Sequence, residues 1–151
     1  MKSPHVYDKA KYHSASIEQA GLPEEHACNH TVVFLRWLLE HDLMSQEFVR
    51  ESDKILKEFR AGKATIYKVY EYWDCCLVDD MLSEEGNAFA MHYFDFDKGQ
   101  YIRDYIDTLQ GSLPSEFYIT FSEDNYQTMR RIMDSRYEEW KRPKKRGWWP
   151  F

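Results

Sequence analysis

The chain of 151 residues is 43% hydrophobic and 17% aromatic, and it carries a formal net charge of −6. This length favours a single domain over residues 1–151, and the aromatic content excludes the intrinsically disordered class. The acidic balance argues against a nucleic-acid partner, because binding to a phosphate backbone depends on lysine and arginine.

The sequence also carries signals about its compartment. No window approaches the roughly 18 consecutive apolar residues of a membrane-spanning helix, and the first residues lack the apolar segment of a signal peptide. The three cysteines, Cys28, Cys75 and Cys76, show no spacing typical of a disulfide framework. We therefore expect a cytoplasmic protein with reduced thiols and no membrane partner.

Apolar residues at helical spacing predict about six helices. The first follows Pro23, which suits the first helical position, and ends near Asp42. The second runs from an N-cap at Ser45 to Gly62, where a left-handed residue ends a helix. The third follows Thr65, with apolar positions as far as Leu77 on its buried side.

The second half of the chain continues the helical pattern. Helices are expected after N-caps at Ser83 and Ser122, with another over residues 102–109 between them. Apolar and polar residues alternate over 116–121, which indicates a short strand or an extended segment. Residues 1–21 are expected to be irregular, and residues 143–151 form a basic, aromatic tail. The whole pattern predicts an all-α, or nearly all-α, compact bundle.

Two histidines form the most prominent chemical signal. His26 and His30 stand four residues apart, so on one helix face they could share a zinc ion. The metalloprotease motif needs a glutamate directly after the first histidine, and Ala27 stands there instead. The sequence shows no glycine-rich phosphate loop, nucleophile elbow or CxxC pair. We therefore expect no catalytic residues and no cofactor, with a metal-assisted hydrolase using His26, His30 or His13 as an alternative.

The charges are unevenly distributed. Residues 1–140 contain 15 of the 20 basic residues and all 26 acidic ones, so this part has a net charge of −11. Such a body suits a basic protein partner, which it would attract electrostatically. A short acidic cluster is either a solvated turn or part of a negative patch for that partner; its members are Asp79, Asp80, Glu84 and Glu85.

The C-terminal tail combines the opposite charge with large aromatic side chains. Trp and Arg are favoured at the centres of protein interfaces, so the tail is a candidate anchor in a partner's pocket. Alternatively, the tryptophans fold back onto the domain, or the tail mediates self-association. The tail residues concerned are Lys144, Arg146, Trp148 and Trp149.

Three parts of the chain carry a family resemblance. The first is Tyr7–His13 (YDKAKYH) together with the helix that begins LPEEHA and continues through His30 to Leu38. The second is Glu84–Ala90 (EEGNAFA), and the third is Tyr137–Lys141 (YEEWK) with the basic, tryptophan-rich terminus. The chain resembles a family of small bacterial proteins of unknown function with an Asp-x-Ala-Lys-aromatic-His opening. The positions that match the family pattern are Asp8, Lys11, Tyr12, His13, Pro23, His30 and Trp37.

Members of that family look like immunity proteins of bacterial polymorphic-toxin systems. The resemblance implies a protein that neutralises a cognate toxin by direct binding. The pattern positions then form either a ligand site or a structural clasp between the N-terminal segment and the first helix.

Overall fold

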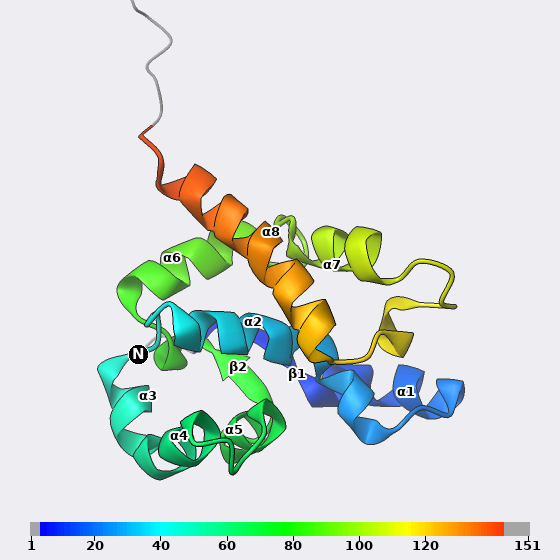
Figure 1. Ribbon diagram of the computed structural model, residues 1–151, viewed down its shortest axis with the longest axis horizontal. Coiled ribbons are helices and arrows are strands. Elements are labelled where there is room, and N and C mark those ends of the chain that lie inside the picture. The colour runs from blue at the N-terminus through cyan, green and yellow to red at the C-terminus, as the bar shows by residue number, and fades with distance from the viewer. Residues whose placement is uncertain (1–3, 144–151) are drawn as a thin grey trace, which may run out of the picture.

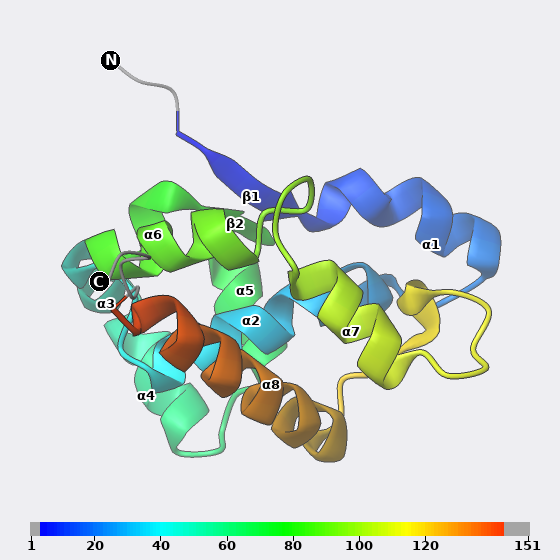
Figure 2. The same ribbon diagram turned by 90° about the horizontal axis from the view of Figure 1, so that it is seen from above.

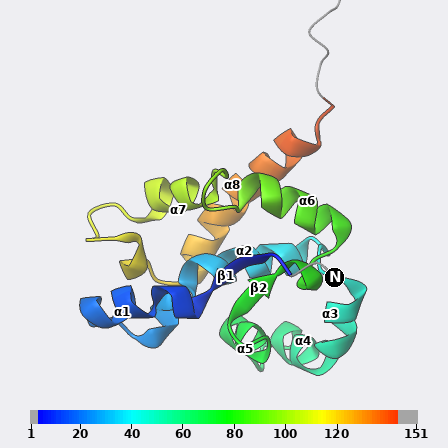
Figure 3. The same cartoon turned by 180° about the vertical axis from the view of Figure 1, so that it is seen from behind.

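Helix α2 (Asn29–Glu40) lies at the centre of the computed structural model, which describes residues 4–143 (Figure 1). Ten of its twelve residues are buried. A helix that is buried around nearly its whole circumference must be surrounded by other helices and strands. Figure 1 shows α8 (Glu123–Lys141) crossing one side of α2, and Figure 3 shows a small sheet on the opposite side.

The other elements are arranged around α2. The remaining α-helices of the described residues are α1 (Ser14–Ala20), α3 (Gln46–Glu51), α4 (Asp53–Arg60), α5 (Ile66–Tyr72), α6 (Glu84–Tyr93) and α7 (Tyr101–Leu109). Short 3-10 helices are η1 (Ala10–His13), η2 (Glu24–Ala27), η3 (Asp79–Met81) and η4 (Glu116–Tyr118). The predicted mostly helical class is confirmed. None of the helices over residues 4–143 is long and apolar enough to cross a membrane.

Aromatic side chains fill the space between α2 and the helices above it. Phe34 on α2 stacks on Phe94 with ring centroids 4.5 Å apart, and Trp37 lies 5.3 Å from Phe89 of α6. Tyr101 of α7 completes this layer, 4.9 Å from Phe94. Offset and edge contacts of this kind are favourable between aromatic rings, which accounts for the high aromatic content of the chain.

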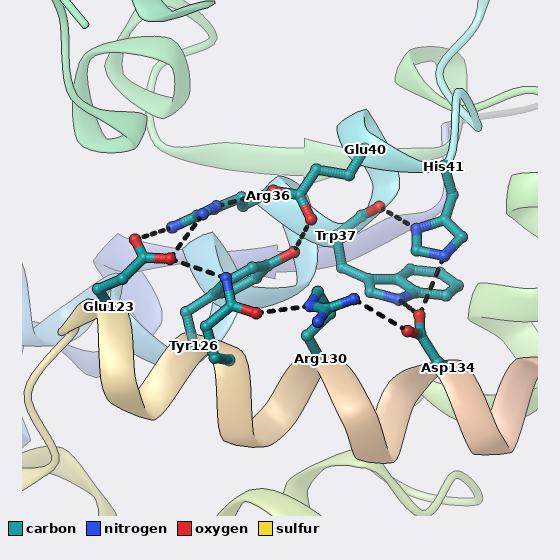
Figure 4. A network of polar contacts seen from close by, with 9 residues as sticks. Arg36, Trp37, Glu40, His41, Glu123, Tyr126, Arg130 and Asp134 are labelled. Carbon is teal, nitrogen blue, oxygen red and sulfur yellow. Dashed lines mark hydrogen bonds and ion pairs between the residues drawn. The ribbon is translucent and has the colours of Figure 1, made fainter.

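A polar seam joins α2 to α8 along the edge of the core (Figure 4). Arg36 binds both carboxylate oxygens of Glu123 at 2.9 and 3.1 Å and lies over the ring of Tyr126. The Tyr126 hydroxyl donates to Glu40 at 2.6 Å. The indole nitrogen of the buried Trp37 donates to Asp134 at 2.9 Å. The seam therefore satisfies the polar ends of side chains whose rings are buried.

The sheet makes the N-terminal segment part of the fold. Strand β1 (Val6–Lys9) pairs antiparallel with β2 (Cys76–Val78), and a bulge between Val6 and Asp8 interrupts the register. Because the bulge breaks the alternation of the strand, the consecutive residues Tyr7 and Asp8 are both buried. The expectation that residues 1–21 are irregular is wrong, since β1, η1 and α1 occupy most of them. Figure 2 shows β1 leading directly into η1 and α1 along one edge of the molecule.

Several predicted helices are shorter than expected. The segment after Pro23 forms η2 and then α2, and the segment from Ser45 to Gly62 is divided at Ser52 into α3 and α4. Trp73 donates its indole N–H to the buried Ser52 hydroxyl at 2.7 Å, which fixes this break. The helix after Thr65 ends at Tyr72, so Leu77 lies in β2.

Of the two alternatives predicted over 116–121, the structure of these residues has no strand but has an extended segment in the second half. They form η4 followed by an extended segment, and their backbone carbonyls bind side chains instead of a neighbouring strand. Asn29 donates to the Ile119 carbonyl at 2.9 Å, for example. The predicted N-caps are confirmed, because the hydroxyls of Ser45, Ser83 and Ser122 each accept a hydrogen bond from a backbone N–H three residues later.

The buried carboxylate of Asp104 gives a pH-dependent test of the fold. It accepts hydrogen bonds from Tyr93 at 2.7 Å, from Gln100 at 3.2 Å and from two nitrogens of Arg136 at 2.9 Å. Burial alone would raise the pKa of Asp104, but these hydrogen bonds outweigh it and hold that pKa below its ordinary value. A lowered folded-state pKa means that the stabilisation is complete above the unfolded pKa of about 3.9 and is lost as the pH falls below it.

We expect Asp104→Asn to lower the free energy of unfolding by about 1–3 kcal/mol at pH 7, because it breaks charge-assisted hydrogen bonds. The difference from the wild type should shrink as the pH falls below about 4 toward the lowered pKa of Asp104, where the folded wild-type carboxylate loses its charge. Urea unfolding at several pH values measures both effects. The exposed Asp107→Asn is the control, and a penalty for Asp104→Asn that does not change with pH would contradict the assignment.

Candidate functional site

Asp8 is the centre of a polar cluster built from three elements. It lies on β1, His13 ends η1, and His30 and Thr31 are in the first turn of α2. His13 Nε2 lies 2.8 Å from one Asp8 carboxylate oxygen, and His30 Nε2 lies 3.0 Å from the other. The Thr31 hydroxyl donates to the second oxygen at 2.5 Å.

Local backbone geometry orients these side chains. In a 3-10 helix residues three apart lie on the same side, so Ala10 and His13 of η1 face inward together. Lys11 and Tyr12 between them are exposed, and Tyr12 has 63% of its surface accessible. The bulge in β1 places Asp8 inward beside Tyr7. On the other side, the Tyr101 hydroxyl donates to the His30 carbonyl at 2.5 Å and fixes the start of α2.

The surroundings keep Asp8 ionised although only 1% of it is exposed. Burial by itself would raise the pKa of Asp8, but the hydrogen bonds and charge of His13 and His30 hold that pKa well below its usual range. An ionised carboxylate only accepts hydrogen bonds, so each imidazole contacts it through a protonated Nε2. A buried charge needs partners of this kind, and the cluster therefore links the N-terminal segment firmly to α2.

A cavity of about 250 Å³ adjoins the two histidines; its lining comprises His13, His30, Phe96, Ile102, Glu116 and Phe117. Phe117 on its wall is held in place by His26, whose Nδ1 lies 2.6 Å from the Phe117 carbonyl. Imidazoles, aromatic rings and one carboxylate therefore meet around a space large enough for a few water molecules or a small polar ligand.

The structure unites some of the family-pattern positions and separates others. Asp8, His13 and His30 are in direct contact, as a clasp between the N-terminal segment and the first helix requires. Trp37 lies two turns further along α2, in the seam with α8. Lys11 and Pro23 line a different groove.

The structure does not bring His26 and His30 together in one site. His26 belongs to η2 and binds the Phe117 carbonyl, whereas His30 belongs to α2 and binds Asp8. Within residues 4–143, the metal-binding donor atoms that converge are those of Asp8, His13 and His30. The sequence did identify these three as pattern positions, but spacing alone could not pair a strand residue with a helix residue 22 positions later.

A larger groove of about 650 Å³ lies between the N-terminal segment and α5. Four carboxylates line it together with one lysine; the charged lining residues are Lys11, Glu24, Glu25, Glu71 and Asp74. The thiol of Cys28 lies at its floor, and burial raises the pKa of Cys28 to about 12. A thiol that stays protonated is a poor nucleophile, so the groove is suited to binding basic groups and not to thiolate chemistry.

The predicted acidic cluster lies at the other end of β2, in η3 and the first turn of α6. Asp80, Glu84 and Glu85 are exposed and Asp79 is partly buried. Glu85 accepts a hydrogen bond from the Tyr137 hydroxyl, so one member of the cluster is also structural. The predicted anchor residues Lys144, Arg146, Trp148 and Trp149 lie outside the described residues.

Comparison with protein families matches residues 6–119 to a domain of unknown function, DUF7832. The matched region contains the Asp8 cluster, the cavity and the acidic groove. No curated protein and no solved structure matches the chain.

We expect Thr31→Val to lower the free energy of unfolding by about 1–2 kcal/mol, because it removes one hydrogen bond to a buried carboxylate at constant side-chain size. Chemical denaturation measures the change. Thr128→Val is the matched control, since the Thr128 hydroxyl donates to the Asp124 backbone carbonyl at the surface of α8. Equal effects of the two substitutions would show that Asp8 does not depend on Thr31.

Proposed function

The chain belongs to the DUF7832 family, and we propose that it acts in the cytoplasm as an immunity-type protein that neutralises a cognate toxin by direct binding. The observation that carries the proposal is the acidic groove, in which four carboxylates converge on a concave surface beside the N-terminal segment. Such a surface receives lysine or arginine side chains of a basic partner, and charge complementarity of this kind accelerates association.

The composition of the groove supports binding over catalysis. Its acidic residues come from three separate segments, η2, α5 and the turn before β2, which the fold holds at fixed positions. Tyr12 follows the groove residue Lys11 in the chain and is exposed, and tyrosine is among the residues that contribute most at protein interfaces. Lys11 and Pro23, both family-pattern positions, line the groove, so the proposed docking surface includes part of the pattern.

The acidic surface extends beyond the groove. The cluster of Asp79, Asp80, Glu84 and Glu85 lies at the opposite end of β2 and has the same sign of charge. A basic target that covers β2 would meet negative charge at both ends. The net charge of −11 over residues 1–140 provides a longer-range attraction that salt weakens.

The first experiment is an affinity capture from the native host, followed by expression of the captured partner alone and together with this protein. We expect one stoichiometric basic partner that arrests growth alone and loses its toxicity when the two are expressed together. A stoichiometric partner that is harmless by itself would contradict the immunity role.

Charge reversal then locates the interface. We expect the combined change Glu24→Lys, Glu71→Lys and Asp74→Lys to slow association with the captured partner by about 10- to 1,000-fold at low salt. The combined change Asp97→Lys, Asp107→Lys and Glu138→Lys alters the net charge equally at exposed residues away from the groove. Stopped-flow or biosensor association rates measure both. Equal slowing by the two variants would mean that total charge, not the groove, guides the partner.

A further inference from the structure

We propose that Asp8, His13 and His30 form a binding site for a divalent transition-metal ion, of which zinc is the first to test. Their donor atoms, one carboxylate oxygen and two imidazole nitrogens, all lie within 4.8 Å of one another. This inference does not depend on the immunity-type function, because it concerns a different surface and a different ligand.

The spacing of the donor atoms fits a shared ion. Ligand atoms about 2.1 Å from one zinc ion stand about 3.0–3.4 Å apart, depending on the coordination geometry. The Asp8 oxygens lie 2.8 Å from His13 Nε2 and 3.0 Å from His30 Nε2. Because all three donor atoms already lie within 4.8 Å of one another, small side-chain rearrangements convert the hydrogen-bonded cluster into a coordination shell.

The donor types select the class of metal. Imidazole nitrogen favours zinc, copper, iron, cobalt and nickel, whereas calcium and magnesium prefer shells made entirely of oxygen. Two histidines and one carboxylate leave coordination positions open, as in catalytic zinc and non-haem iron sites. Irving–Williams preference further favours zinc over iron or manganese at equal concentration.

Outer contacts hold the ligands in place. Thr31 donates to Asp8 at 2.5 Å, and Tyr101 donates to the His30 carbonyl at 2.5 Å. The bond from Thr31 fixes the orientation of the ligating carboxylate, and the bond from Tyr101 holds the backbone that carries His30. Two of the three ligands, His30 and Asp8, are also already buried.

The remaining ligand gives the ion a route into the site. The His13 side chain is 18% exposed, compared with 5% for His30 and 1% for Asp8. His13 and His30 also line the cavity of about 250 Å³ that contains Glu116. An ion bound by both imidazoles therefore borders a cavity with room for water, and the Glu116 carboxylate lies on the wall of the same cavity.

Binding exchanges hydrogen bonds for coordinate bonds. A neutral imidazole binds the ion through an unprotonated nitrogen, so Nε2 of each histidine gives up its hydrogen bond to Asp8 and the ring proton resides on Nδ1. The Asp8 charge is then balanced by the ion instead of by two N–H groups. The cluster has two alternative arrangements, a hydrogen-bonded clasp and a metal centre, and the ion concentration decides between them.

The test uses the full chain after treatment with a chelator. Isothermal titration with Zn²⁺, with dialysis and metal analysis as a second measurement, should give one bound ion per chain and a raised melting temperature. Co²⁺ as a probe should give the visible absorption of a nitrogen- and oxygen-ligated site. We expect His13→Gln to weaken Zn²⁺ binding by about 100-fold or more, since it removes one of three ligands.

The control is His92→Gln, which removes an exposed histidine away from the cluster and should leave binding unchanged. Circular dichroism without metal checks that His13→Gln folds. If that variant is unstable, the stoichiometry and the Co²⁺ spectrum of the wild type still test the proposal. Unaltered Zn²⁺ affinity in His13→Gln would place the ion elsewhere. The proposal would be overturned if the wild-type chain bound less than about 0.1 equivalent of Zn²⁺ or Co²⁺, a tenth of the expected one ion per chain. The cluster would then be a structural clasp alone.

Discussion

The buried negative charge of Asp8 is the constraint on which the N-terminal half of this structure depends. An isolated carboxylate in an apolar environment costs several kcal/mol, so the fold has to bring it enough hydrogen-bond donors to remain ionised. His13, His30 and Thr31 supply them, and they come from two different elements. If strand β1 separated from α2, the Asp8 carboxylate would lose the hydrogen bonds from His30 and Thr31. The sheet, η1 and the start of α2 therefore form one cooperative unit around a single carboxylate.

The aromatic core obeys a similar rule at its edges. Buried tyrosine and tryptophan rings contribute a large apolar area, but each also carries a polar atom that needs a partner. Tyr7 donates to Asn87 at 2.5 Å, Tyr93 donates to Asp104 at 2.7 Å, and Trp37 donates to Asp134 at 2.9 Å. These bonds join β1 to α6, α6 to α7, and α2 to α8, so the hydroxyl and indole groups fix the outer elements relative to one another and to α2. An aromatic-rich chain of this length gains its specificity of packing from these polar ends.

The sequence predicted the parts of the fold that local chemistry determines. Serine N-caps and helical apolar spacing identified α6 and α8 because both signals lie within a few residues of each other. The strand β1 was missed because its four residues show no alternation, and its partner β2 lies about 70 positions later. The helix break at Ser52 was also missed because its partner is distant in sequence: it depends on a hydrogen bond from the indole of Trp73. Of the candidate site, the sequence provided its members as family-pattern positions, whereas their convergence on Asp8 depends on long-range pairing that spacing does not encode.

The short helix η1 connects the two surfaces to which we assign roles. Its three-residue period directs His13 toward Asp8 and places Lys11 beside the acidic groove, so one rigid turn carries a residue of each. A displacement of the η1 backbone moves His13 and Lys11 together, because a 3-10 turn has few internal degrees of freedom. The hydrogen bond from the Ala10 N–H to the Cys75 carbonyl, 3.0 Å long, passes such a movement to the turn that holds Asp74 in the groove. A metal ion that displaced η1 on binding would therefore alter the groove as well, and by linkage a partner in the groove would change the metal affinity by the same factor.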